Sequence, residues 1–167
     1  MGEKETLERA REDKREGKSP STQAGEFVRE EMDHIREGKH GARSTKQAVA
    51  IGLSKARRAG VKLAAPKPGK SSSATRRHAE RDLEKGRTGS RRKTSAARSR
   101  AVSKALKREG HSAASKSSLS KQARSSARSR SAQARHRSAE KAVHTKGKAG
   151  LKRAARKAAR TRARRAA

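Results

Sequence analysis

The chain contains no cysteine, tryptophan or tyrosine and only one phenylalanine among its 167 residues. Without cysteine, neither a disulfide framework nor a thiolate zinc site can compensate for a small core. Hydrophobic residues make up 29% of the chain, so most of it lacks the apolar area that offsets chain entropy. The scarcity of aromatic residues also argues against modules that stack nucleic-acid bases on aromatic side chains, such as RRM and OB folds.

Long apolar runs are missing as well. Nowhere do about 18 consecutive apolar residues offer a membrane span, and the first residues, "MGEKETLERAREDKREGK", lack the apolar segment of a secretory signal. The sequence therefore predicts a soluble protein with a cytoplasmic location and no membrane partner.

Positive charge is what the chain has in excess. It carries 48 Lys and Arg against 16 Asp and Glu, a formal net charge of +32. The charge is uneven, because residues 1–37 have a net charge of −3 and residues 38–167 a net charge of +35. The repulsion among these positive charges opposes compaction of the chain unless a polyanion neutralises them. We therefore expect a nucleic-acid partner.

One amphipathic helix is expected within "SPSTQAGEFVREEMDHIREG". Ser19-Pro20 suits a helix start, and Gly38 suits the position just after a helix end. An apolar stripe at helical spacing runs from Ala24 to Ile35, with Phe27 beside it.

The segment "STKQAVAIGLSKARRAG", residues 44–60, predicts the partner helix. Ser44 and Gln47 have the spacing of a capping box, and Gly60 closes the segment. The connection between the two helices is short, which favours an antiparallel helical hairpin. Its core would include Ile51.

The chain divides by composition into five segments. We expect a charged N-terminal helix or arm, solvated rather than packed, then a helical hairpin, a linker, a degenerate second hairpin and a basic tail, at residues 1–18, 19–63, 64–75, 76–110 and 111–167. The second hairpin is expected because residues 86–110 resemble residues 38–60; chance similarity in low-complexity sequence is the alternative.

The Ser/Ala/Arg-rich tail has hardly any large apolar side chains. We expect nothing from residue 111 onward to contribute to a core, and we expect the tail to be largely disordered until phosphates screen its charges. The predicted fold class is all-α, with one or two small helical hairpins and a long, largely disordered basic tail.

The basic runs carry the functional signal, because they place a cation every two or three residues along the chain. Residues 86–167 hold 27 basic and two acidic residues. The predicted nucleic-acid-binding residues are Arg91, Arg92, Lys93, Arg98, Arg100, Lys104, Lys107, Arg108, Arg124, Arg128, Arg130, Arg135, Arg137, Lys152, Arg153, Arg156, Lys157, Arg160, Arg162, Arg164 and Arg165.

No catalytic constellation is evident. Glu30 and His34 lie one helical turn apart, with Asp33 and His40 nearby, but no third ligand is fixed and a charged helix face is the simpler interpretation. The Walker A-like "AAPKPGKS" lacks the strand that such a loop needs. We therefore expect a protein that is not an enzyme, with no cofactor, no metal and no small-molecule substrate.

The segment "REEMDHIREGKHGARSTKQAVAIGLSKARRAG" resembles a family of small, uncharacterised bacterial basic proteins, often labelled plasmid-stabilisation or DNA-binding. The likeness rests on a helix, a Gly38-Lys39 turn and the residues around Lys46, Gln47 and Ser54. The Ala/Lys/Arg-rich C-terminus is separately similar to bacterial linker-histone-like proteins. These resemblances imply a bacterial origin and DNA binding.

The leading hypothesis is a nucleoid-associated, linker-histone-like protein that binds DNA largely independently of sequence by neutralising the phosphate backbone. An RNA- or ribosome-associated protein is the alternative, because Arg-Ser alternation also suits RNA-binding segments. A third possibility is a hairpin that binds another protein, with a basic tail that localises it.

Overall fold

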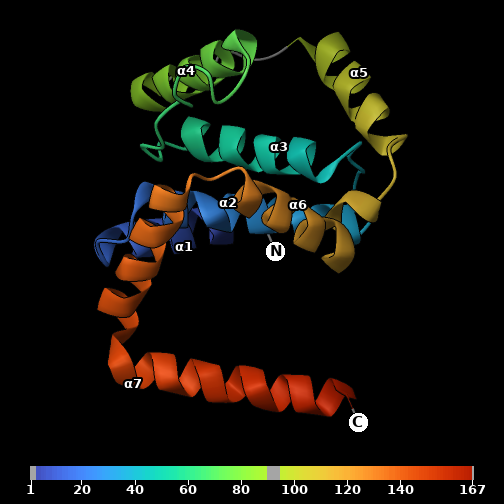
Figure 1. The fold of residues 1–167 in the computed structure, drawn as a ribbon. Helices are drawn as coiled ribbons and strands as arrows, with labels where there is room; N and C mark the ends of the chain where they lie inside the picture. The colour runs from blue at the N-terminus through green and yellow to red at the C-terminus, as the bar shows by residue number, and fades with distance from the viewer. Residues whose placement is uncertain (1–2, 90–94, 167) are drawn as a thin grey trace. The chain divides into compact units, whose positions relative to one another are not determined.

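The computed structural model describes residues 3–89 and 95–166, with the side chains of 165 and 166 left aside. Within these ranges the regular structure is helical, without a strand, as the sequence predicts. The elements in Figure 1 are α1 (Glu3–Arg15), α2 (Pro20–Arg36), α3 (Thr45–Arg58), α4 (Ser73–Thr88), α5 (Ala96–Lys107), a short 3-10 helix η1 (Ser112–Ala114), α6 (Lys116–Arg128) and α7 (Ala132–Ala166).

The chain divides into two units, Met1–Gln122 and Ala123–Ala167. The core lies in the first unit, where α2 packs against both α1 and α3. The second unit contains the end of α6 and all of α7. No helix within 3–89 or 95–166 is long and apolar enough to cross a membrane.

Helix α2 begins and ends where the sequence predicts. Ser19 is the N-cap residue and Pro20 takes the first helical position, where the missing N–H of proline costs nothing. The helix closes just before Gly38, whose φ of +75° lies in the left-handed region that glycine tolerates best. The predicted entry and exit signals are confirmed.

Helix α3 is capped by a variant of the expected capping box. Ser44 Oγ accepts a hydrogen bond of 3.2 Å from Gln47 N, as predicted. The Gln47 side chain reaches one residue further than in the standard box and accepts a 2.9 Å bond from Arg43 N. Both bonds satisfy backbone donors that the helix itself leaves free.

Two clusters of buried apolar side chains form the core, and both are rich in alanine. The first contains Met32, Ile35, Ala42, Ala48, Ala113 and Ala114. The second contains Ala10, Ala24, Phe27, Ala56 and Val61. Ile51, which the sequence places in the core, belongs to neither cluster and is only half-buried.

Small residues let α2 and α3 approach closely. A Cβ atom added at Gly52 would lie 2.7 Å from Val28 Cα and 3.0 Å from Phe27 O. Close backbone contact raises the number of dispersion contacts for each side chain. A chain with one aromatic residue therefore forms a core through close approach rather than through large side chains.

A matched pair of glycine substitutions tests this close approach, because Gly25 and Gly52 both lie inside helices. A Cβ at Gly25 would meet nothing within 4 Å, so Gly25→Ala should stabilise the protein by up to about 1 kcal/mol through helix propensity. Gly52→Ala should instead destabilise it by about 1–3 kcal/mol through overpacking. Urea unfolding followed by circular dichroism measures both; a stabilising Gly52→Ala would contradict the packing.

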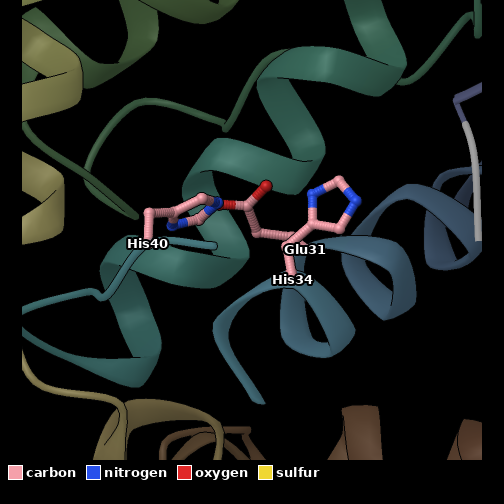
Figure 2. Close-up of side chains that lie close together, drawn as sticks. All are labelled: Glu31, His34 and His40. Carbon is pink, nitrogen blue, oxygen red and sulfur yellow. The ribbon is translucent and has the colours of Figure 1, made fainter. Parts of the chain in front are cut away.

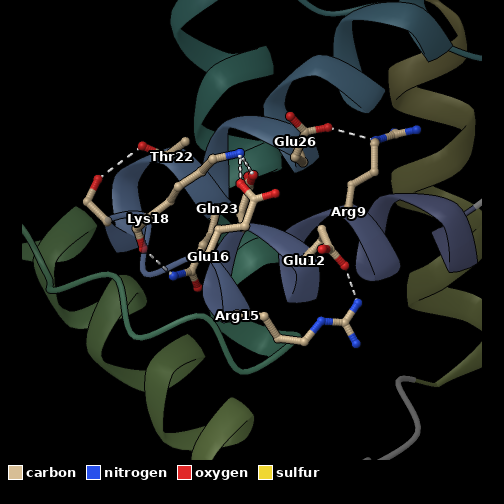
Figure 3. A network of polar contacts seen from close by, with 10 residues as sticks. Arg9, Glu12, Arg15, Glu16, Lys18, Thr22, Gln23 and Glu26 are labelled. Carbon is tan, nitrogen blue, oxygen red and sulfur yellow. Dashed lines mark hydrogen bonds and ion pairs between the residues drawn. The ribbon is translucent and has the colours of Figure 1, made fainter. Parts of the chain in front are cut away.

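Helix α1 packs against α2 rather than standing in solvent. Arg9 Nε donates a 2.7 Å hydrogen bond to Glu26 Oε2 across the two helices, and Lys18 Nζ lies 2.7 Å from Asp13 Oδ1 (Figure 3). Hydrogen bonds to Asp13 and Glu16 raise the pKa of Lys18. Our expectation of a solvated N-terminal helix is corrected, because Ala10 is small enough to let α1 sit against the second cluster.

The core extends further along the chain than the sequence predicts. Ala113 and Ala114 of η1 are buried, and Leu119 packs against the same cluster. Thr45 Oγ1 donates a 2.7 Å hydrogen bond to Ala113 O, and Arg36 Nε donates one of 3.1 Å to Ala114 O. The expectation that nothing after residue 110 contributes to a core is therefore wrong, because two alanines and backbone carbonyls suffice to dock η1.

Helix α4 packs against α3. Ser54 Oγ donates a 2.5 Å hydrogen bond to Asp82 Oδ2, and a Cβ at Gly86 would lie 2.0 Å from Arg57 O. Glycine at position 86 thus permits direct backbone contact between the two helices. That residues 76–110 repeat the first hairpin stays a prediction.

The basic tail is helical rather than largely disordered, which corrects the sequence-based expectation. Ser115 Oγ accepts a 3.1 Å bond from Ser118 N before α6, and Ser131 Oγ accepts a 3.2 Å bond from Ala134 N before α7. These serine caps, together with the high helix propensity of Ala, Arg and Lys, favour helices despite the like charges. Helix α7 is interrupted at Gly147, whose φ of 63° and ψ of 171° are not helical.

Candidate nucleic-acid interface

The structure places most of the predicted nucleic-acid-binding residues on three helices. Arg98, Arg100, Lys104 and Lys107 lie on α5, with Arg108 as its C-terminal cap. Arg124 and Arg128 lie on α6, and Arg130 lies in the turn that follows. Helix α7 carries Arg135, Arg137, Lys152, Arg153, Arg156, Lys157, Arg160, Arg162, Arg164 and Arg165. Arg91, Arg92 and Lys93 lie outside the described residues.

Those of these cations whose side chains the structure describes share two properties, exposure and the lack of an acidic partner among the described residues. Every one whose side chain is described is solvent-exposed, and none of them forms an ion pair with an acidic group of the described part of the chain.. In residues 123–167, 16 basic residues face a single acidic one, Glu140. Their charge is thus available to an external anion.

Several acidic residues in α1–α4 instead form ion pairs with cations of these helices. Arg58 lies 3.6 Å from Asp82, and Arg87 Nη2 lies 2.7 Å from Glu84 Oε1. The Arg87 guanidinium lowers the pKa of Glu84, because it stabilises the ionised carboxylate. Most ion pairs of the described residues thus lie within α1–α4 and their connections, whereas the predicted binding cations of α5–α7 form none.

One face of α7 after Gly147 concentrates the positive charge. Arg153, Arg156, Lys157, Arg160 and Arg164 border one shallow concavity together with Thr161. Arg153, Arg156 or Lys157, Arg160 and Arg164 follow one another at three or four residues, which places them on one side of a helix. We call these five residues the α7 cationic stripe. At 1.5 Å per residue it extends over about 16 Å.

The structure provides no aromatic stacking platform within its described residues. Phe27, the sole aromatic residue of the Phe, Trp and Tyr class, is 6% exposed and belongs to the second core cluster. Phe27 is therefore not positioned to stack on a nucleic-acid base.

The structure also gathers a set of side chains that sequence reasoning did not select. We had paired Glu30 with His34, whereas the structure brings Glu31 together with His34 and His40, with their ligand atoms within 4.8 Å of one another. The i, i+3 spacing of Glu31 and His34 was visible in the sequence. The approach of His40 depends on the turn after α2.

A family model described as a family of unknown function, DUF6496, matches residues 14–68. The matched segment runs from the end of α1 through α2 and α3. No curated protein and no solved structure matches the chain. The similarity therefore covers the hairpin and its flanks, and the cationic helices α5–α7 lie beyond it.

Proposed function

We propose that this protein is a non-enzymatic DNA-binding protein that neutralises the phosphate backbone with little dependence on base sequence. The observation that supports this most is the set of exposed cations on α5–α7 without acidic partners in the described chain. The proposal includes a cytoplasmic location in association with the nucleoid.

The proposed mechanism is electrostatic. Duplex DNA carries one negative charge per about 1.7 Å of helix axis, with condensed counterions that a cationic protein releases on binding. Helical presentation spaces the cations regularly, so the α7 cationic stripe can follow a row of phosphates. Little ordering of these helices is required on binding, which removes part of the entropic cost of a disordered tail.

The class of nucleic acid is tested by measuring affinity for two unrelated duplexes and for single-stranded RNA between roughly 50 and 300 mM salt. We expect nearly equal affinities for the two duplexes, with a steep salt dependence for both. A strong preference for RNA would replace this proposal with an RNA- or ribosome-associated function. A strong preference for one duplex would contradict backbone recognition.

The α7 cationic stripe provides a sharper test. Replacing its five residues with Gln should reduce the magnitude of the slope of log K against log salt by about 4.5, because each lost phosphate contact removes about 0.9. Replacing its four arginines with Lys keeps the charge and should leave the slope unchanged. Fluorescence anisotropy with a labelled duplex measures the slope for both variants. An equally large fall in the slope for the Lys variant would indicate arginine-specific recognition.

A further inference from the structure

We infer that Glu31, His34 and His40 form a binding site for a divalent transition-metal ion of the zinc class. Glu31 and His34 lie on α2, and His40 lies in the turn that leads to α3. Figure 2 shows the Glu31 carboxylate between the two imidazole rings. This site does not depend on the proposed DNA binding.

The ligand atoms of the three side chains lie nearly as close together as the ligand atoms around a bound metal ion. Their ligand atoms lie within 4.8 Å of one another, and His40 Nε2 lies 3.5 Å from Glu31 Oε1. Bonds of about 2.0 Å to a tetrahedral ion place ligand atoms roughly 3.3 Å apart. Rotation of the two imidazoles, whose centroids are 6.1 Å apart, closes this difference.

The hydrogen bond of His40 selects the nitrogen that faces the site. His40 Nδ1 lies 3.2 Å from Gly41 O, so Nδ1 donates its proton to this carbonyl. In the neutral imidazole the lone pair then lies on Nε2, which is the nitrogen 3.5 Å from Glu31 Oε1. Metal-binding histidines commonly have this arrangement, in which a backbone carbonyl fixes the tautomer.

His34 has a carboxylate beside it in the same way. Its Nε2 lies 3.9 Å from Glu30 Oε1, and this buried oxygen accepts no hydrogen bond from the described residues. A carboxylate next to a metal-bound histidine orients the ring and raises its basicity. Glu30 would thus act as a positioning residue, with His34 Nδ1 left to bind the ion.

Burial of the carboxylates gives the site its attraction for a cation. Glu30 is 1% exposed and Glu31 is 0% exposed, and buried carboxylates require compensating charge. Lys55 Nζ forms an ion pair of 2.9 Å with Glu31 Oε2, and neither Glu31 oxygen accepts a hydrogen bond from the described residues. Lys55 is thus the one cationic side chain paired with Glu31 apart from His40 within the described chain, and Glu31 Oε1 is the oxygen that faces His40.

The ligand set indicates the class of metal and leaves one coordination position of the ion open to solvent. Two imidazoles and one carboxylate favour Zn²⁺ or a neighbouring first-row ion over Mg²⁺ or Ca²⁺, which prefer oxygen ligands. The imidazoles are 15% and 19% exposed, so an ion can enter from solvent. Three protein ligands leave a fourth position for water.

Bound metal would link the turn after α2 to the body of that helix. The same turn contacts the C-terminal end of α5, because Gly41 N donates a 2.9 Å hydrogen bond to Leu106 O. Metal that binds the folded state alone raises its stability with concentration. We therefore expect the melting temperature of the full chain to rise on addition of Zn²⁺.

The experiment is a titration of the metal-free full-length protein with Zn²⁺, followed by calorimetry in a buffer without chelators. We expect saturable 1:1 binding, weakened at least about tenfold by His34→Ala and by His40→Ala. His136→Ala is the matched control, because His136 Nδ1 lies 3.3 Å from Glu140 in an exposed i, i+4 pair, and it should bind Zn²⁺ as the parent does.

Two further measurements separate loss of a ligand from loss of the fold. Circular dichroism of the metal-free variants should show helix content and melting like those of the parent. X-ray absorption of the Zn²⁺-loaded parent should show two imidazoles and oxygen ligands at about 2.0 Å. No 1:1 binding, an equal loss in His136→Ala, or fewer than two imidazoles on the bound ion would overturn the site.

Discussion

A chain that ends at Arg130 should lose most of its affinity for duplex DNA at physiological salt. The deletion removes 13 basic residues and one acidic residue, Glu140, and it cuts in the turn between α6 and α7. If ten of these cations contact phosphates, the slope of log K against log salt should fall in magnitude by about 9. Over a fourfold change in salt, ten contacts account for roughly a 10⁵-fold change in affinity.

The deletion leaves the two core clusters intact, since both lie within residues 7–119. Urea unfolding of the core should therefore stay near that of the full chain, which serves as the control for folding. Anisotropy titrations at several salt concentrations measure the slope. A truncated protein that binds duplex DNA as tightly as the full chain, with the same slope, would place the interface outside α7.

Ile35→Ala should destabilise the first unit by about 2–5 kcal/mol, the usual range for truncating a fully buried Ile. Ile35 is 0% exposed and belongs to the first cluster, together with Met32 and Ala48. Because its neighbours are mostly alanines, few side chains can move in to fill the cavity. Amide exchange of peptides from α2 and α3 measures the loss directly.

Val102→Ala is the control for this substitution, because Val102 on α5 is 54% exposed. It should change the opening free energy obtained from amide exchange in α2 and α3 by less than about 0.5 kcal/mol, as surface substitutions usually do. Equal effects of the two substitutions would mean that Ile35 is not part of a packed core.

The hairpin could be predicted because its signals are local. Ser19-Pro20, Gly38, Ser44 and Gly60 mark helix ends through backbone chemistry that neighbouring residues determine, and the structure has helices between them. The docking of η1 could not be predicted in this way. Ala113 and Ala114 carry no pattern, and their burial depends on Thr45 and Arg36 from distant parts of the chain.

The helical tail was missed for a different reason. The mutual repulsion of its cations predicts disorder, but the helix propensity of Ala, Arg and Lys and the caps at Ser115 and Ser131 outweigh that repulsion in the structure. The residues of the inferred metal site were missed for the reason that applies to η1: Glu31 and His34 share a helix, but His40 reaches them only through the turn at Gly38. The cations of the candidate interface were selected from charge density alone.

Gly147 limits the length of uninterrupted straight helix in α7. An uninterrupted helix of its 35 residues would be a rod of about 52 Å, longer than the 34–36 Å of one DNA turn. Because the groove winds around the duplex, a straight helix of this length would diverge from it, and the far end of the helix would not contact the DNA. The backbone at Gly147 suits glycine almost alone, and it replaces the rod with two segments that are each shorter than one turn of DNA. If the tail binds duplex DNA as we propose, each segment can follow its own stretch of groove, and Gly147 then limits how much of the tail's charge a single duplex can reach.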